Sequence, residues 1–411
     1  MNFSIKVTPK IFLSFIIFFS IVRFHPNLVP ATLAVYWYDI VLIILAFIWL
    51  FYVNETISEE IKEIYFLFLL LLPFLIIPSL FVENLAGYYL NLNKLLMYVL
   101  YIVALLSIIR RSKFSVDSYI KLLDVAFLIV FAVAVIQLLE PPVFGQIIHL
   151  LFGDEKLRSI WAGYPRAYST FYNPNWFAVY IIFMMIVWLN YFLVYSKKVS
   201  WLAVRAFPLL VLLFFSGSRS GILVFIFLSI ITLLSYNYSA KSLIKYTFSF
   251  FIICVILIGV LDYFMALINL DRLIGRFDIF ILALSGDFEI DQSLMGRFES
   301  QSKSIGYIIE KPLFGYGDRP ENMVPHNSIL TLLLSFGLIG FLGISIFVTL
   351  LVIRVLLIKS KFKNVIYFKR NFILFSLGLF VAMMAADLIY TSQVMFLWIL
   401  SLALILSFTY K

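Results

Sequence analysis

Residues 175–195 read NWFAVYIIFMMIVWLNYFLVY, a predominantly apolar run without one charged side chain. A transmembrane α-helix needs about 20 such residues. Of all 411 residues, 64% are hydrophobic and only 13% are charged, whereas soluble domains average about 25% charged residues. In a bilayer, every backbone N–H and C=O must be paired within the protein, so only helices or closed barrels cross it. Because the apolar runs are continuous and do not alternate, we predict an all-α, polytopic integral membrane protein.

Apolar windows of this kind recur along the whole chain. They predict about 12 transmembrane helices in a single transmembrane domain that comprises residues 1–411. The expected spans are 11–23, 32–53, 64–82, 94–109, 118–139, 175–195, 199–216, 220–236, 246–268, 327–352, 372–387 and 389–408.

Residues 269–326, between the ninth and tenth expected spans, make one large loop. Cytoplasmic loops are enriched in Lys and Arg. When both chain ends are placed in the cytoplasm, most of the 31 Lys and Arg residues fall on the cytoplasmic side and this loop becomes external (periplasmic). The net charge of +9 therefore indicates membrane orientation and not binding to nucleic acid.

The large loop contains a helical pattern over residues 296–310. Pro312 follows its end, and one apolar stripe is formed by Phe298, Ile305, Ile308 and Ile309. This pattern predicts an amphipathic helix, and such a helix can lie on the membrane surface.

Three polar patches interrupt the apolar runs, and the predicted topology puts all three on the external face. They are Tyr172-Asn173-Pro174-Asn175, Gly217-Ser218-Arg219-Ser220-Gly221 and Pro325-His326-Asn327. Arg219 offers a planar guanidinium that suits phosphate, in a turn that needs no charge. His326 suits proton exchange near neutral pH, although a histidine can also simply begin a helix at the interface. Asn173 and Pro174 are typical of a helix start.

Other charged residues fall on or near this face. Arg166 lies upstream of the first patch, and Arg297 and Arg319 lie in the large loop. Asp387 falls inside an apolar run, as do Asp39 and Asp262. Ionisable residues in a bilayer usually face a polar cavity or pair with one another; the alternative is a helix-end charge that reaches the interface.

Five short motifs occur between residues 165 and 345. They are STFYNPNWFA (169–178), SGSRSG (216–221), GRFE (296–299), EKPLFGYG (310–317) and PHNSIL (325–330). In this order they resemble the O-antigen ligase and polymerase superfamily of bacterial surface-polysaccharide assembly. Arg219 and Leu223 match the Arg-x-x-x-Leu pattern of the ligases, and His326 with Gly337 resembles their histidine motif. Gly343 departs from that motif, which usually ends in Thr, Asn, Tyr or Phe.

The resemblance implies a metal-independent glycosyltransferase that needs no cofactor. Its donor would be a glycan on undecaprenyl diphosphate, and its site would face outward from the bacterial cytoplasmic (inner) membrane. A hydroxyl would attack the anomeric carbon, and the lipid diphosphate would leave. The implied catalytic residues are His326, as the proton acceptor, and Arg219, which would stabilise the leaving diphosphate. Residues expected to bind diphosphate or glycan are Arg166, Asn173, Asn175, Arg297 and Asn327.

The acceptor separates the possible functions. A polymerase of O-antigen, capsule or exopolysaccharide uses another lipid-linked repeat unit, whereas a ligase uses lipid A–core in lipopolysaccharide synthesis. Gly343 favours the polymerase. A non-enzymatic flippase or exporter of the same lipid-linked glycan is the third possibility, and the host can be Gram-negative or Gram-positive. Expected partners are the lipid-linked glycan, membrane lipid, and flippase and chain-length regulator proteins, but no nucleic acid.

Overall fold

The computed structural model describes residues 8–22, 59–112, 114–139, 167–171, 173–234, 292–320 and 323–409. All regular structure in these ranges is helical, so the predicted all-α class is confirmed. The helices are α1 (Pro9–Ile21), α3 (Glu59–Ser79), α4 (Leu85–Ser112), α5 (Val116–Leu139), α8 (Pro174–Tyr195), α9 (Val199–Ser216), α10 (Arg219–Leu234), α13 (Gln292–Glu310), α14 (Ser328–Leu357), α15 (Lys363–Ala385) and α16 (Ser392–Thr409).

Eight of the described helices are long and apolar enough to cross a membrane, and two shorter apolar helices lie at 9–21 and 220–232. The chain is therefore a multi-pass membrane protein. The expected spans 32–53 and 246–268 lie outside the described residues, so the total of about 12 remains a prediction. The side of the membrane on which the 269–326 loop lies also remains a prediction.

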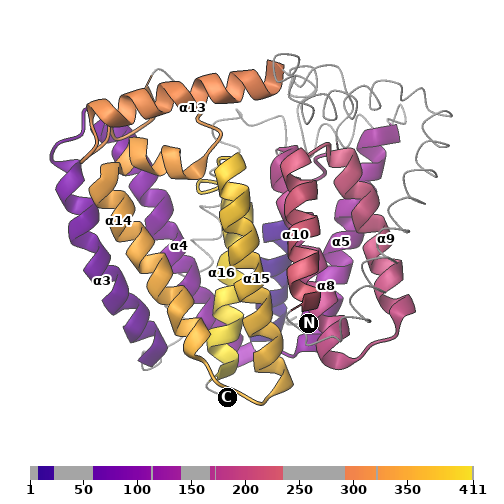
Figure 1. Cartoon of the computed structure of the whole chain (residues 1–411). Helices are drawn as coiled ribbons and strands as arrows, with labels where there is room; N and C mark the ends of the chain where they lie inside the picture. Colours follow the sequence, from indigo (N-terminus) through magenta and orange to yellow (C-terminus); the bar gives the residue numbers. More distant parts are fainter. Residues whose placement is uncertain are drawn as a thin grey trace, which may run out of the picture.

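The spanning helices run side by side in one bundle, and α13 lies across one end of it (Figure 1). Helices α8 and α16 are buried over most of their length. Helix α8 packs against α9, α10 and α15, whereas α16 packs against α4 and α15. On the other side of the bundle, α14 packs against α3. The predicted helix at 296–310 is thus confirmed as α13, which begins four residues earlier, at Gln292.

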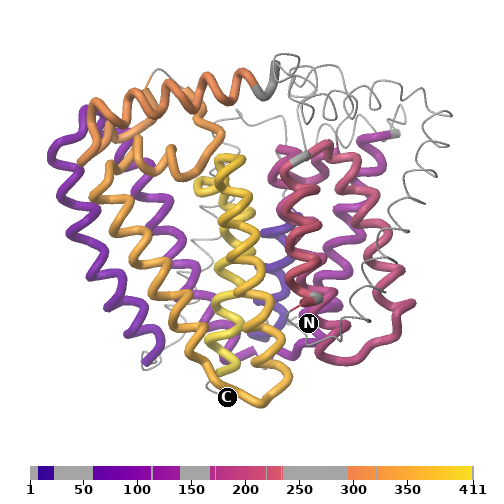
Figure 2. Tube along the Cα trace, in the orientation of Figure 1, coloured from indigo at the N-terminus to yellow at the C-terminus, as the bar shows by residue number. Residues whose placement is uncertain are grey.

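The sequence predicts α14 as one continuous span, 327–352, and this expectation is wrong in one respect. The helix is broken at Gly337, where the backbone has φ 62° and ψ −172°. The chain turns there, so that residues 328–336 and residues 338–357 run in different directions (Figure 2). The first part contacts the region of α13, and the second part runs along the bundle beside α3.

The segment 312–317, which we call the brace, crosses α14 at this break. The N–H groups of Leu338 and Ile339 donate to the carbonyls of Pro312 (2.8 Å) and Leu313 (3.2 Å). The N–H of Tyr316 donates to the carbonyl of Leu334 (2.7 Å). Backbone groups freed by a helix break must find partners inside a membrane protein. The brace provides these partners on both sides of Gly337.

Glycine is required where the brace meets the break. A Cβ on Gly337 would lie 2.3 Å from the Leu313 carbonyl oxygen. A Cβ on Gly315, which has φ 71°, would lie 2.6 Å from the carbonyl oxygen of Leu334. The two backbones cross too closely for any side chain, and the positive φ angles also favour glycine. The glycines of the EKPLFGYG motif and Gly337 therefore have a packing role.

Candidate functional site

His326 lies in the short link between the α13 region and α14. It adopts a left-handed conformation with φ 52°. The next residue, Asn327, caps α14: its Oδ1 accepts from the N–H groups of Ile329 (2.9 Å) and Leu330 (3.2 Å). Its Nδ2 donates to the Met384 carbonyl at 3.1 Å. Asn327 therefore fixes the start of α14 against the end of α15.

The surroundings of His326 are positively charged. The guanidinium groups of Arg297, on α13, and Arg319, just after the brace, both act on it. Burial, and then these two charges, lower the pKa of His326 below its ordinary value of 6.5. The charged imidazolium is disfavoured here, so the histidine is neutral at neutral pH. A neutral imidazole can accept a proton or orient a hydroxyl group.

Asp387 lies close to this histidine site, in the link between α15 and α16. Its Oδ2 is 3.5 Å from Nη1 of Arg319. Burial raises the pKa of the Asp387 carboxyl, whereas Arg319 and Lys94 lower it. Asp387 lies beyond the end of α15, which stops at Ala385, so the expected span 372–387 extends too far at its C-terminal end. The sequence predicts a cavity-lining or paired acid at this position, and the structure pairs it with Arg319.

Ser328 ties the start of α14 to the same α15–α16 link. Its hydroxyl donates to the Ala386 carbonyl (3.0 Å) and accepts from the Leu388 N–H (2.7 Å). On α4, the amide of Asn91 donates to the Gly317 carbonyl and to the Ser335 hydroxyl, each at 3.2 Å. Hydrogen bonds from α4, the brace and the α15–α16 link therefore support the first part of α14 and hold His326 beneath α13.

The first polar patch forms the start of α8. The Oδ1 of Asn173 accepts from the Asn175 N–H at 2.8 Å, and Pro174 occupies the first turn. Upstream, residues 167–171 are buried, and neutral amides satisfy their backbone. Gln137 Nε2 donates to the Ser169 carbonyl (3.0 Å), and Gln393 Nε2 donates to the Thr170 carbonyl (3.2 Å). This patch ends in a well-capped helix start.

The second polar patch forms the turn between α9 and α10. Gly217 ends α9 in a left-handed conformation with φ 59°. The Ser218 hydroxyl accepts from the Gly221 N–H at 3.2 Å. A Cβ on Gly221 would lie 2.6 Å from the Cβ of Ala178, so the starts of α10 and α8 pack closely. Arg219 is the first residue of α10.

The predicted site residues thus fall into two groups among the described residues. Arg297, His326 and Asn327 lie in the region under α13, whereas Asn173, Asn175 and Arg219 lie at the adjoining starts of α8 and α10. Arg166 lies outside the described residues. The described part of the chain contains no group of three or more His, Cys, Asp or Glu residues that could hold a metal ion.

From the sequence, Arg319 is expected only as one of several positive charges near this face and Asp387 only as a cavity-lining or paired acid, and Lys94 is not expected there at all. Asp387 does carry a signal, because an acid inside an apolar run is costly. The role of Arg319 carries none, since the contact joins the large loop to the distant α15–α16 link.

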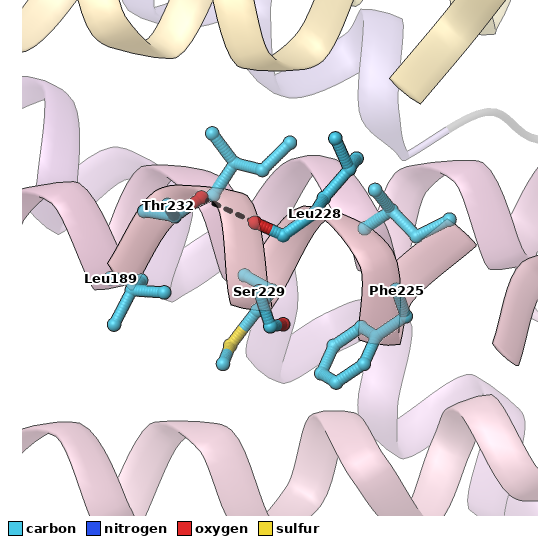
Figure 3. Close-up of a pocket in the computed structure, with 8 residues that line it drawn as sticks. Leu189, Phe225, Leu228, Ser229 and Thr232 are labelled. Atoms are coloured by element: carbon cyan, nitrogen blue, oxygen red, sulfur yellow. Dashed lines mark hydrogen bonds between the residues drawn. The ribbon is translucent and has the colours of Figure 1, made fainter. Parts of the chain in front are cut away.

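A depression between α8 and α10 is a different kind of feature. It is lined by Ile182, Met185, Ile186, Leu189, Phe225, Leu228, Ser229 and Thr232, several of which Figure 3 shows. The Thr232 hydroxyl donates to the Leu228 carbonyl of its own helix at 2.6 Å. With no charged residue in its lining, this depression offers no chemistry comparable to that around His326.

Residues 204–345 match the family model described as O-Antigen ligase. The match runs from α9 into the second part of α14 and includes Arg219, Arg297 and His326. Over these residues, the match confirms the similarity to the O-antigen ligase and polymerase superfamily that the motifs indicate. No curated protein shows a significant match to the chain.

Proposed function

We propose that this multi-pass membrane protein polymerises undecaprenyl-diphosphate-linked oligosaccharide repeat units on the outer face of the bacterial cytoplasmic membrane. The match of residues 204–345 to the model described as O-Antigen ligase supports glycosyl transfer at a membrane. The observation that carries the proposal is the neutral, half-buried His326 beside Arg297 and Arg319. A proton acceptor and fixed positive charges are the two requirements for transfer from a lipid diphosphate.

The proposed reaction is a single displacement at the anomeric carbon of the donor glycan. The acceptor hydroxyl forms the new C–O bond, and the bond from the anomeric carbon to the diphosphate oxygen breaks. His326 takes the hydroxyl proton as general base. Arg297, together with Arg219 at the start of α10, stabilises the negative charge that develops on the leaving lipid diphosphate. The products are a longer glycan and free undecaprenyl diphosphate.

Ligation to lipid A–core is the second candidate, because the matching family model is described as a ligase. Gly343, which favours the polymerase, also has a packing reason. A Cβ at this position would lie 2.3 Å from the Cβ of Phe74, so glycine lets α14 approach α3 closely. The departure from the ligase pattern therefore carries less weight on the acceptor than the sequence suggests.

Reconstitution tests the proposal. The purified full chain in proteoliposomes receives an undecaprenyl-diphosphate-linked repeat unit, with or without lipid A–core. Longer lipid-linked glycan and free undecaprenyl diphosphate without lipid A–core are the expected result. Product that forms only with lipid A–core would identify a ligase. Movement of the intact donor across the bilayer without transfer would identify an exporter and overturn the proposal.

A further inference from the structure

Helix α13 turns a polar face towards the protein. Arg297, Ser300, Gln301 and Ser304 lie on its less exposed side, which Tyr307 and Ile308 continue towards the end of the helix. The Ser300 hydroxyl donates to the carbonyl of Val324 at 2.6 Å, two residues before His326. Surface helices of soluble proteins usually bury an apolar face. In α13 most of the inner side is polar instead, and Ser300 fastens the helix to the segment that leads into α14.

The outer surface of α13 carries two different flanks. The apolar flank consists of Met295, Phe298, Ile305 and Ile309, whose exposed fractions are 46%, 56%, 49% and 71%. The other flank is charged: Nζ of Lys303 lies 2.7 Å from Oε1 of Glu299, and both side chains are well exposed. At 3.6 residues per turn, these sets occupy separate sides of the helix. Only the charged flank is suited to contact with water.

The apolar flank continues into the membrane-facing surface of the bundle. Beyond Ile309, the exposed Leu313 follows, and the ring of Phe314 stacks on Phe81 with centroids 4.3 Å apart. Phe81 and Leu80, just past the end of α3, are 59% and 72% exposed. The spanning helix α3 exposes further apolar side chains along its length. The lipid that surrounds α3 in the bilayer is therefore also in reach of the end of α13.

We propose that α13 is an interfacial helix whose apolar flank inserts into the acyl chains of the adjoining membrane leaflet. Its charged flank then faces water, and its polar face covers the region of His326. Helices with separate apolar and charged sides bind membranes in this manner. A continuous exposed apolar surface of this kind marks an interaction site. This position also places Arg297 at the level of the lipid head groups.

Spin labels on α13 test this placement without any measurement of activity. The single cysteine, Cys254, is first removed by Cys254→Ser. Labels are then attached singly through Phe298→Cys, Ile305→Cys and Ile309→Cys in the full chain, in bilayers of phosphatidylethanolamine and phosphatidylglycerol. Lys303→Cys on the charged flank is the matched control. Power saturation compares collisions with lipid-soluble oxygen and with a water-soluble nickel complex.

The oxygen-to-nickel ratio is expected to be severalfold higher at positions 298, 305 and 309 than at 303. Equal ratios would overturn the proposal, because the apolar flank would then lie in water. Exclusion of both reagents from the three positions would also overturn it, since another segment of the chain would then cover the flank. Dipolar broadening between labels would overturn it in favour of a second copy on the flank. If one of the three variants fails to insert into the membrane, the other two positions still decide the outcome.

Discussion

The first turns of α8 and α14 are both capped by an asparagine but have different surroundings. Asn173 and Asn327 each cap a helix and accept an N–H from the residue two positions later, at 2.8 Å and 2.9 Å. Helix α8 then runs unbroken through the core, whereas α14 breaks at Gly337. Neutral Gln137 and Gln393 serve the backbone before α8, whereas charged residues gather at the start of α14.

This difference shows that an asparagine at a helix start is no sign of a site by itself. The charged groups that distant segments bring to the start of α14 make it a candidate for chemistry. Arg297 comes from α13, Arg319 follows the brace, and Asp387 comes from the α15–α16 link. If the two helix starts differ in function as they differ in their surroundings, substitutions at the start of α14 should impair activity and those at the start of α8 should not.

Among the residues that surround His326, the largest expected effect is on Arg297. Removing one preorganised donor to a developing oxyanion typically costs about 10²–10³-fold in kcat, so Arg297→Ala should slow release of undecaprenyl diphosphate by that order. Lys303→Ala, on the exposed flank of the same helix, is the control and should leave the rate unchanged. Similar rates for both variants, at equal protein levels, would show that Arg297 only fastens α13.

The next effect concerns the break in α14. Gly337→Ala puts a Cβ against the Leu313 carbonyl and requires a positive φ, and such strain costs about 1–3 kcal/mol. A Cβ on Gly306, in α13, meets nothing within 4 Å, so Gly306→Ala should gain about 0.5–1 kcal/mol from helix propensity. Thermal unfolding in detergent should therefore move in opposite directions for the two variants. A Gly337→Ala protein as stable as wild type would rule out the tight crossing of the brace.

The two asparagine caps provide the direct comparison of the helix starts. Loss of an asparagine cap typically costs about 0.5–2 kcal/mol, so Asn173→Ala and Asn327→Ala should lower the unfolding temperature by similar amounts. Only Asn327→Ala should also lower activity per folded molecule, because it frees the backbone next to His326. Equal specific activities in the two variants would remove the functional difference between the starts of α8 and α14.

The smallest expected effect is a shift of the pH profile. The pKa of His326 is lowered, so its neutral form persists below pH 6.5 and activity falls only as the pH drops through the lowered pKa. Arg319→Gln removes one of the positive charges responsible. The pKa should then rise towards 6.5, and the acid limb of the profile should move to higher pH. Lys303→Gln is the control and should leave the acid limb of the pH profile in place. An unchanged acid limb in Arg319→Gln would mean that protonation of His326 does not determine this limb.

Hydropathy predicts the helices well because each span must bury its backbone in lipid on its own. It does not predict the break at Gly337, since the residues on both sides are equally apolar and the brace that permits the break comes from another motif. The stripe expected on α13 includes Ile308, which lies on the inner side with Ser304. Periodicity finds the helix, but its orientation depends on the distant carbonyl of Val324.

The sequence identifies His326, Arg297 and Asn327 from short motifs that resemble a family. It does not predict the role of Asn327 as a cap that contacts the end of α15, because Met384 is far away along the chain. The pairing of Arg319 with Asp387 is unpredicted for the same reason. Single motifs specify residue types, whereas the positive charge around His326 arises from the packing of separate segments.

The rate of undecaprenyl diphosphate release by His326→Ala in proteoliposomes, at wild-type protein level and beside Asn173→Ala, tests the central claim most directly. Loss of a general base typically costs about 10²–10⁴-fold. We expect a loss of this order for His326→Ala, and near-normal release per folded molecule for Asn173→Ala. Normal release by a folded His326→Ala protein would contradict the assignment of the chemistry to the start of α14.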